Sequence, residues 1–293
     1  MKQSAPFLIL TAGILWGLIG VFIRRLNGMG FGSMEIAAVR AVSTALLTLA
    51  FLSVYDRRLL KIRLRDLWCF LGTGIFSIVF FNYCYFQAIS LTSLSAAAVL
   101  LYTAPAFVMV LSAILFRERI TGIKILSLIV TFAGCVLVTG LVGAAQSLSP
   151  QGILVGLGAG FGYALYSIFS RFALERGYHA FTISFYTFLF AIAGTVPLAD
   201  WSILRTAVTG GVGTAGFCLL FGLFSTVIPY IVYTLGLKET ENGRASILAS
   251  VEPVTATVLG VAVYREPMSF SQLCGVLLVL GAIVLCSLEK KPE

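Results

Sequence analysis

A single carboxylate interrupts a long apolar run near the end of the chain. Glu252 stands within ASILASVEPVTATVLGVAVYREP, residues 245–267, and Pro253 follows it directly. A charge at the centre of a bilayer costs about 2.5 to 3.5 kcal/mol on insertion scales, so such residues usually face a cavity or a partner. Three roles are open for Glu252: contact with a substrate ammonium, protonation in apolar surroundings, or pairing with an internal cation. Pro253 removes a backbone donor and frees the carbonyl of Ala249, which adds a polar weak point beside the acid.

The cation best placed to meet Glu252 is Arg40, near the start of the apolar segment 34–55. Its long side chain could descend to the depth of Glu252 and pair with it. It could instead bind a substrate carboxylate in bidentate fashion, or extend outward to the interface. Glu35, expected at the outer interface, is the alternative partner for Arg40.

Polar and aromatic side chains at helical spacing could line a cavity around Glu252. Asn82 with Tyr85, and Tyr230 with Tyr233, are three residues apart and so share a helix face. Further aromatic walls, able to hold an apolar or cationic ligand, are expected from four residues: Trp16, Tyr83, Tyr102 and Tyr163. Ordinary helix packing or interfacial anchoring is the alternative role for each of them.

The elements that must position these residues are membrane-spanning helices. The chain of 293 residues is 59% hydrophobic and only 11% charged, whereas a typical soluble domain carries about a quarter charged residues. Apolar stretches long enough to cross about 30 Å of hydrocarbon as helices recur along the whole length, and they are too long and too evenly apolar for barrel strands. The expected helices are 6–26, 34–55, 66–90, 93–116, 122–141, 151–174, 179–200, 208–236, 243–264 and 269–288. The predicted fold class is therefore an all-α integral membrane protein.

The distribution of Lys and Arg predicts the orientation of these ten helices. The net charge of +8 could suggest a nucleic-acid partner, but the basic residues gather on one side, so no nucleic-acid binding is expected. With a cytoplasmic N-terminus, the inner segments hold Lys2, Arg57, Arg58, Lys61, Arg63, Arg65, Arg117, Arg119, Lys124, Arg171, Arg176, Lys238, Arg244, Lys290 and Lys291. The outer segments hold only Arg24, Arg25, Arg205 and Arg265. We therefore expect both termini to be cytoplasmic and the first helix to be retained, because no small-residue cleavage site follows it.

The two halves of the chain repeat each other. A shift of 148 residues lays Leu100–Arg119 over Leu248–Pro267, so that Pro105 meets Pro253, and it lays Asn82 and Tyr85 over Tyr230 and Tyr233. A shift of 147 lays Trp16 over Tyr163 and Arg24 over Arg171. Agreement in order along the chain favours a duplication, with domains 1–145 and 146–293 of five helices each. Pro105 and Pro253 are expected to break their helices at equivalent depth, and the two Asn/Tyr and Tyr/Tyr pairs to face each other.

An odd number of spans per copy places the two copies in opposite directions. Inverted repeats of this kind are a recurring design of secondary transporters, with the substrate site near the middle of the membrane between the copies. Two similar halves can exchange packing arrangements at little difference in free energy, so an outward-open state becomes the near mirror of an inward-open state.

These features together resemble the EamA family of the drug/metabolite transporter superfamily. The resemblance covers nearly the whole chain and rests on Trp16 with Gly17, on Arg40, on the stretch 105–118, and on VEPV through YREP at 251–267. It implies ten helices around a central cavity lined largely by the first, third, fourth, sixth, eighth and ninth, and export of amino acids or other small metabolites. One departure matters, because Ala104 stands where the repeat would place a second Glu252.

The remaining motifs predict packing rather than chemistry. QGILVGLGAGFG, residues 151–162, lacks the GxGxxG pattern and lies within an apolar span, so Gly152, Gly156 and Gly160 are expected to form a helix-packing seam, as are Gly13 and Gly17. Arg117 with Glu118, and Arg265 with Glu266, are expected as ion pairs that cap the bundle, although one could serve as a gate. The six scattered cysteines are expected to pack as small apolar residues, and the lone His179 has no triad or metal companion.

The expected function is secondary transport. The sequence contains no GxxxxGK[ST], HExxH or GxSxG motif, so neither an ATPase nor an enzyme is expected, and no cofactor or metal. We expect a multi-pass protein of the bacterial cytoplasmic membrane that exports small metabolites, amino acids or their analogues first, by alternating access, with proton coupling open. A drug or other organic-solute exporter, an uncoupled facilitator or channel, and a non-transporting sensor or scaffold are the alternatives. The expected partners are a small-molecule substrate, the lipid bilayer and protons, and the chain is a monomer or a homodimer.

Overall fold

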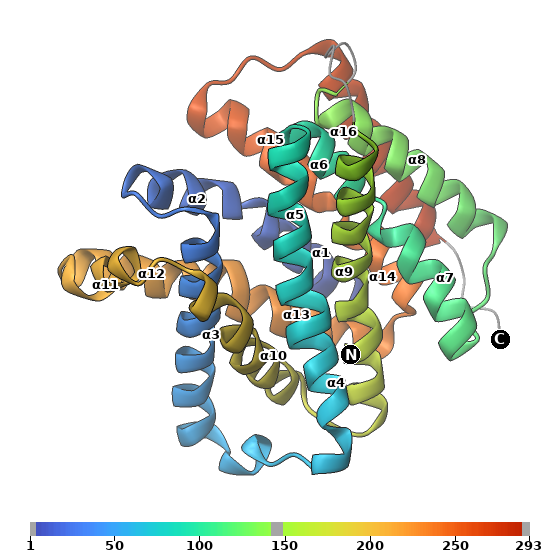
Figure 1. The fold of residues 1–293 in the computed structure, drawn as a ribbon. Coiled ribbons are helices and arrows are strands. Elements are labelled where there is room, and N and C mark those ends of the chain that lie inside the picture. Colours follow the sequence, from blue (N-terminus) through green and yellow to red (C-terminus); the bar gives the residue numbers. More distant parts are fainter. Residues whose placement is uncertain (1–3, 142–148, 289–293) are drawn as a thin grey trace.

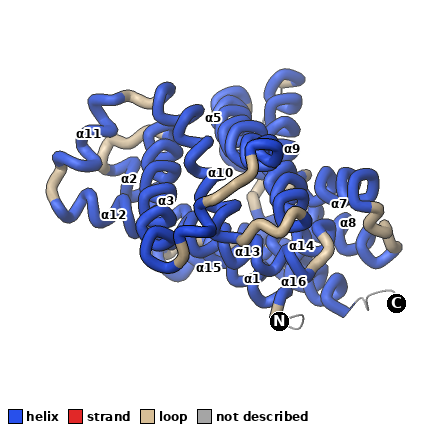
Figure 2. The backbone as a smooth tube through the Cα atoms, turned by 90° about the horizontal axis from the view of Figure 1, so that it is seen from below, coloured by secondary structure: helices blue, strands red, loops and turns tan. Residues whose placement is uncertain are grey.

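The computed structural model describes residues 4–141 and 149–288, and within these ranges it consists of helices joined by loops (Figures 1 and 2). Nine helical segments there are long and apolar enough to cross a membrane, and a tenth, Gly122–Val138, is shorter. The all-helical fold with ten spans is therefore confirmed. Lys2, Lys290, Lys291 and the expected domain boundary at 145/146 lie outside the described residues.

We number the spans 1 to 10 in chain order. The first five are α1 (Ala5–Gly17) with α2 (Ile19–Gly28); α3 (Ser33–Tyr55); η2 (Leu64–Asp66), α4 (Leu67–Leu71), η3 (Gly72–Val79) and α5 (Phe80–Leu91); α6 (Leu94–Leu101) with α7 (Ala104–Phe116); and α8 (Gly122–Val138). The second five are α9 (Pro150–Glu175); α10 (Ala180–Thr195) with η4 (Val196–Leu198); α12 (Val212–Gly222), η5 (Leu223–Val227) and α13 (Ile228–Glu239); α14 (Asn242–Ala249) with α15 (Val251–Tyr264); and α16 (Phe270–Leu288). Two short helices lie in the connections, η1 (Arg57–Leu60) and α11 (Trp201–Thr209).

Equivalent spans of the two halves run antiparallel. The end of α3 meets the start of α10, where the rings of Phe51 and Phe181 lie 5.0 Å apart between centroids. At the opposite end, the backbone N–H of Asp200, just beyond α10 and η4, donates to Oε1 of Glu35 near the start of α3 (2.8 Å). Spans 5 and 10 pair in the same antiparallel way. The two halves therefore have opposite orientations in the membrane, as predicted.

Local features recur 148 residues apart. Arg117 and Arg265 both end their helices in the left-handed conformation, with φ of 57° and 56°. Spans 4 and 9 are both broken in the middle, at Tyr102 and at Ser250, just before the prolines that were expected to break them. Spans 3 and 8 each contain a wider, π-helical stretch, η3 and η5. The duplication that the sequence indicates is thus present in the backbone.

The helix packing also repeats between the two halves, and each half packs on the first span of the other. Helix α5 packs on α9 as α13 packs on α1, and α7 packs on α9 as α15 packs on α1. Each of these contacts joins one half to the other. Helices α1 and α9 therefore form the centre of the molecule, as their positions in Figure 1 show.

Glycines allow the central helices to approach closely. A Cβ at Gly13 would lie 2.7 Å from the carbonyl oxygen of Ala249, and one at Gly17 would lie 2.8 Å from the carbonyl oxygen of Glu252. The α9 glycines pack on the end of span 3 and on α6 in the same intimate way: Gly152, Gly156 and Gly160. Both predicted seams are confirmed, and the first one presses α1 directly against the break in span 9.

The start of span 8 differs from the predicted helix 208–236. Residues 201–209 belong to the separate helix α11, and the chain turns at Gly211, whose φ is 95°. Side-chain-bearing residues rarely adopt this conformation, so Gly211 ends one helix before α12 begins, a break that hydropathy does not reveal. Together with α2 and α12, α11 lies on one flank of the molecule, opposite α7, α8 and α16 (Figures 1 and 2). The other predicted bounds agree with the structure to within three residues.

Candidate functional site

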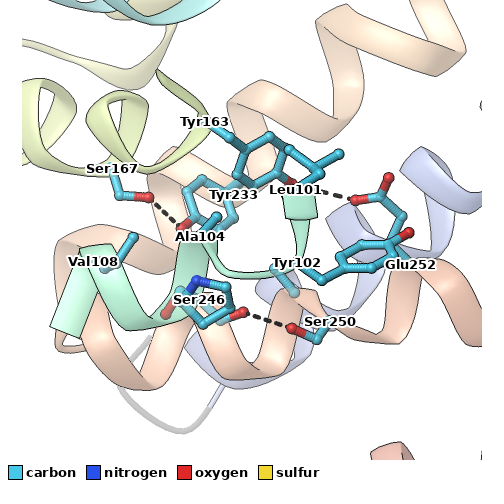
Figure 3. Close-up of a pocket in the computed structure, with 12 residues that line it drawn as sticks. Leu101, Tyr102, Ala104, Val108, Tyr163, Ser167, Tyr233, Ser246, Ser250 and Glu252 are labelled. Carbon is cyan, nitrogen blue, oxygen red and sulfur yellow. Dashed lines mark hydrogen bonds between the residues drawn. The ribbon is translucent and has the colours of Figure 1, made fainter. Parts of the chain in front are cut away.

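A small cavity, of about 20 Å³, lies where the breaks of spans 4 and 9 face each other (Figure 3). Its walls combine both breaks with side chains from α7, α9 and α13: Leu101, Tyr102, Ala104, Pro105, Val108, Tyr163, Ser167, Tyr233, Ser246, Ala249, Ser250 and Glu252. Both halves of the molecule contribute. We call this space the Glu252 cavity.

Glu252 lies in the first turn of α15 because the preceding helix, α14, ends at Ala249 and the chain breaks at Ser250. The aligned peptide dipoles of a helix leave partial positive charge at its N-terminus, which favours a nearby carboxylate. A helix that begins within the membrane therefore offsets part of the cost of placing Glu252 there. Ala104 occupies the equivalent first turn of α7, so the carboxylate belongs to one half only.

Tyr163 connects Glu252 to the other central helix. Its hydroxyl, carried by α9, donates to Oε2 of Glu252 at 3.3 Å (Figure 3). Glu252 itself is partly exposed. A carboxylate oxygen has further lone-pair sites, so Glu252 can accept from a ligand in the cavity while it keeps this bond.

An aromatic cluster adjoins the Glu252 cavity. The ring of Trp16 lies 5.2 Å from that of Tyr230, 5.3 Å from that of Tyr233 and 6.2 Å from that of Tyr163, measured between centroids. These rings wall a second small cavity, of about 20 Å³, together with Phe81. Trp16 is 7% exposed, and its Nε1 has no hydrogen-bond partner within the described part of the chain. Aromatic faces of this kind suit apolar or cationic groups.

Two hydrogen bonds between α9 and α13 hold the cluster in place. Ser167 Oγ and Tyr233 Oη lie 2.7 Å apart, and Tyr166 Oη and Thr234 Oγ1 lie 2.8 Å apart. Neither Tyr166 nor Ser167 was predicted from the sequence as a site residue. Helical spacing could have found them, because they follow Tyr163 by three and four residues and so share its face.

The charge of Arg40 reaches the site without forming an ion pair there. Arg40 lies close enough to Glu252 and Tyr230 for its charge to act on both. No ion pair within 4.0 Å joins Arg40 to Glu252 or to any other acidic side chain that the structure describes. The direct pairing considered from the sequence is therefore not formed, and Glu35 instead accepts from the backbone of Asp200.

The sequence matches one family model twice. The model of the EamA-like transporter family matches residues 3–140 and again residues 150–288. The chain belongs to the EamA-like transporter family. Its two matched stretches fall on the two five-span halves of the fold.

Curated relatives of this EamA-like chain are described as transporters. An uncharacterized transporter of Archaeoglobus fulgidus is 27% identical over 97% of this chain and 96% of its own length. The uncharacterized transporter YetK of Bacillus subtilis is 22% identical over 99% and 89%. The uncharacterized inner membrane transporter YicL of Salmonella typhimurium is 24% identical over 97% and 95%. One crystal structure, 18% identical, superposes with a TM-score of 0.80 over 98% of both chains, which shows that the fold is shared.

Three predicted residues of this EamA-like chain line neither of the two cavities. Tyr83 is 52% exposed and shares an outward face of span 3 with Phe76 and Phe80, so it lines neither cavity. Asn82 donates its amide to the carbonyl of Ile78 in its own span (2.7 Å). Tyr85 stacks on Phe81 (5.7 Å between ring centroids) and lies close enough to Glu252 for the charge of Glu252 to act on it. The expected meeting of Asn82 and Tyr85 with Tyr230 and Tyr233 is not formed among the described contacts, and a chain of ring contacts through Phe81, Tyr163 and Trp16 connects Tyr85 to Tyr230 instead.

The ion pairs predicted to cap the bundle are not formed either. These were Arg117 with Glu118 and Arg265 with Glu266, and both acids take other partners. Glu118 accepts from the backbone N–H groups of Asn242 and Gly243, and Glu266 pairs with Arg24. Neighbouring residues in a left-handed turn point in different directions, so each acid reaches across to the other half of the molecule. Within residues 4–141 and 149–288, no three His, Cys, Asp or Glu side chains gather to hold a metal ion, and no disulfide joins any two of the six cysteines.

Proposed function

We propose that this protein exports small zwitterionic metabolites, amino acids or their analogues, across the bacterial cytoplasmic membrane. It works as a secondary active transporter by alternating access, with both termini in the cytoplasm. The family and the curated relatives support transport as such. The cargo, the coupling and the sidedness are our proposal.

The observation that carries this proposal is the pair of opposite charges at the centre, Glu252 and Arg40. Their charges act on each other, yet they form no ion pair within 4.0 Å. In this proposal a zwitterion bridges them, with its ammonium at Glu252 and its carboxylate in a bidentate contact at Arg40. The neighbouring aromatic cluster would then receive the side chain.

Energy for uphill export would come from an ion gradient, and Glu252 is the residue placed to couple it. A carboxylate that binds either a proton or a substrate ammonium exchanges one for the other at a single site. Alternating access then carries the proton inward and the substrate outward.

The test is transport in reconstituted vesicles. An imposed pH gradient should drive radiolabelled amino acid uphill, and Glu252→Gln should abolish uphill movement. Uphill transport that survives in Glu252→Gln rejects the coupling role of this residue. A variant distant from the cavities, Gln272→Ala, serves as the control for reconstitution.

A second candidate, an exporter of organic cations, is favoured by the aromatic cluster. Trp16 and its tyrosine neighbours can hold a cationic ring through cation–π contacts. Substrate choice separates the two functions. Transport of amines without a carboxylate should depend on Glu252 and not on Arg40, whereas zwitterion transport should depend on both.

A further inference from the structure

One end of the molecule is held by a dense network of hydrogen bonds around the turn 240–243, between spans 8 and 9. Glu118 Oε1 accepts from the N–H of Asn242 at 2.8 Å, and its Oε2 accepts from the N–H of Gly243 at 3.1 Å. Both N–H groups belong to the first turn of α14, where no carbonyl of the same helix can reach them. Glu118 of the first half therefore caps a helix of the second half.

Two further side chains, Arg171 and Ser112, hold the same turn. Arg171 Nε donates to Oδ1 of Asn242 at 3.0 Å, and its Nη2 donates to the carbonyl of Thr240. Asn242 is fully buried and donates through Nδ2 to Ser112 Oγ at 3.0 Å.

Glu241, the neighbouring residue of the turn, is also held by an ion pair. Lys124 Nζ pairs with Glu241 at 2.6 Å, and the Lys124 side chain is only 4% exposed. Spans 4, 5 and 6 thus hold the turn together. Since charge-assisted hydrogen bonds are the strong ones, the turn is held firmly against these spans.

The equivalent residues at the other end are arranged differently. The shift of 148 relates Glu118 to Glu266 and the turn 240–243 to 92–95, and the shift of 147 relates Arg171 to Arg24. Arg24 and Glu266 pair at 2.5 Å, but their side chains are 53% and 48% exposed. No described hydrogen bond or ion pair joins either of them to the turn 92–95.

The turn 92–95 nevertheless offers the same donors. Ser93 Oγ caps α6 by accepting from the N–H of Ala96 at 3.1 Å. The N–H groups of Leu94 and Ser95, which correspond to those of Asn242 and Gly243, have no acceptor among the described residues. They are the donors that Glu266 would need in order to repeat the contacts of Glu118.

We propose that these two sets are the gates of the transport path. Glu118 and Arg171 with the turn 240–243 form the closed gate, and Glu266 and Arg24 with the turn 92–95 form the open one. In the alternate state Glu266 accepts from the N–H groups of Leu94 and Ser95 while Glu118 releases α14. This assignment rests on the proposed alternating access. The contacts of Glu118 are exchanged for those of Glu266, whereas the bonds of Asn242 and Lys124 have no equivalent at Leu94 and Gln272.

Thiol accessibility tests the gates without any substrate. Ser250→Cys, in a chain whose six native cysteines are replaced, places one thiol in the Glu252 cavity. A membrane-impermeant thiosulfonate should label it from the Arg24 end and not from the Asn242 end. Glu118→Ala should raise labelling from the Asn242 end about tenfold, since two charge-assisted hydrogen bonds are lost. The matched variant Glu266→Ala should not raise it.

Cross-linking tests the same gates in a chain that keeps Glu118 and Glu266. A Cβ at position 243 would lie 3.8 Å from Cα of Met109, so Met109→Cys with Gly243→Cys should cross-link rapidly in the resting protein. The equivalent pair Thr257→Cys with Ser95→Cys should cross-link slowly, and faster in a chain that also carries Asn242→Ala. Equal rates for the two pairs, or labelling in Glu118→Ala identical to the parent, would overturn the proposal. Absence of amino-acid transport would reject the proposed cargo but leave these readouts unchanged.

Discussion

Tyr163 donates a hydrogen bond to Glu252 from the opposite half of the molecule, over 3.3 Å. The contact joins α9, the first span of the second half, to α15, the broken span beside α1. Glu252 is therefore in contact with both central helices, α9 through Tyr163 and α1 through Gly17. Movement of one half against the other would change the environment of Glu252 directly, as the proposed coupling role requires.

Loss of the Tyr163 hydroxyl should weaken binding without abolishing it. Tyr163→Phe keeps the ring that packs on Trp16 and removes one hydrogen bond, which contributes about 1 kcal/mol, or about fivefold in affinity. Equilibrium binding of radiolabelled amino acid to the purified protein measures the effect. An affinity unchanged in Tyr163→Phe while Glu252→Gln loses binding would show that Glu252 is held by other groups.

Arg40 should select for a carboxylate on the substrate. Arg40→Gln should reduce the affinity for an amino acid at least tenfold, because a bidentate, charge-assisted contact is lost. It should leave the affinity for the methyl ester of the same amino acid nearly unchanged. Competition binding with the acid and its ester gives both values in one assay, and equal losses for the two ligands would contradict a carboxylate contact.

Gly17 should tolerate no side chain. A Cβ there would lie 2.5 Å from Cβ of Thr255 and 2.8 Å from the carbonyl oxygen of Glu252, so Gly17→Ala should destabilise the fold by about 1 to 3 kcal/mol through overpacking. It should also lower transport, because α15 is displaced. At Gly20 an added Cβ would meet no described atom within 4 Å. The control Gly20→Ala should therefore leave the unfolding temperature in detergent unchanged or slightly higher.

Glycine should relieve the backbone strain at Arg117 and Arg265, which end their helices in the left-handed conformation. A side-chain-bearing residue in this conformation is strained by about 1 kcal/mol, so Arg117→Gly should raise the free energy of unfolding by about 0.5 to 1 kcal/mol. Arg117→Ala retains the Cβ and should bring no gain. Chemical denaturation in detergent measures both, and the same gain in the two variants would assign it to the lost charge.

Glu118 should make the stability of the protein depend on pH. Burial raises the pKa of Glu118 above its ordinary value of 4.5, while the N–H groups of Asn242 and Gly243 and the charge of Arg171 oppose the rise and Glu241 adds to it. The same recess is lined by Glu175, Lys238 and Glu239, and Lys124 pairs with Glu241.

A carboxyl whose pKa is raised on folding binds more protons in the folded chain than in the unfolded one. Its contribution to stability therefore falls as pH rises from 4.5 through the raised pKa. The unfolding temperature of the parent should decline over this interval relative to that of Glu118→Gln, which does not titrate. If the unfolding temperature of the parent instead rises relative to that of Glu118→Gln as pH increases, the hydrogen bonds to the ionised carboxylate outweigh the cost of its burial.

Much of the fold was predictable because hydropathy and the repeat act over long stretches. Ten helices, their inverted halves and the breaks beside Pro105 and Pro253 follow from apolar length, an odd number of spans and the loss of a backbone donor. The break at Gly211 was missed because one glycine in an apolar sequence does not reveal its φ angle. Tyr83 was placed wrongly because aromatic residues suit a cavity wall and a lipid-facing surface equally well.

The sequence by itself determined that Glu252 lies deep within a membrane span, that Pro253 breaks that span, and that the first half has Ala104 instead of an acid. Those facts depend on residue type and position along one helix. Only the tertiary structure decided that Tyr163 reaches Glu252 and that Arg40 stands near Glu252 without pairing with it. It also decided that Glu118 caps α14, whereas Glu266, among the described contacts, pairs with Arg24 instead of capping α6. These contacts join segments far apart in the chain, and their geometry depends on how the two halves are tilted against each other, which no local pattern records.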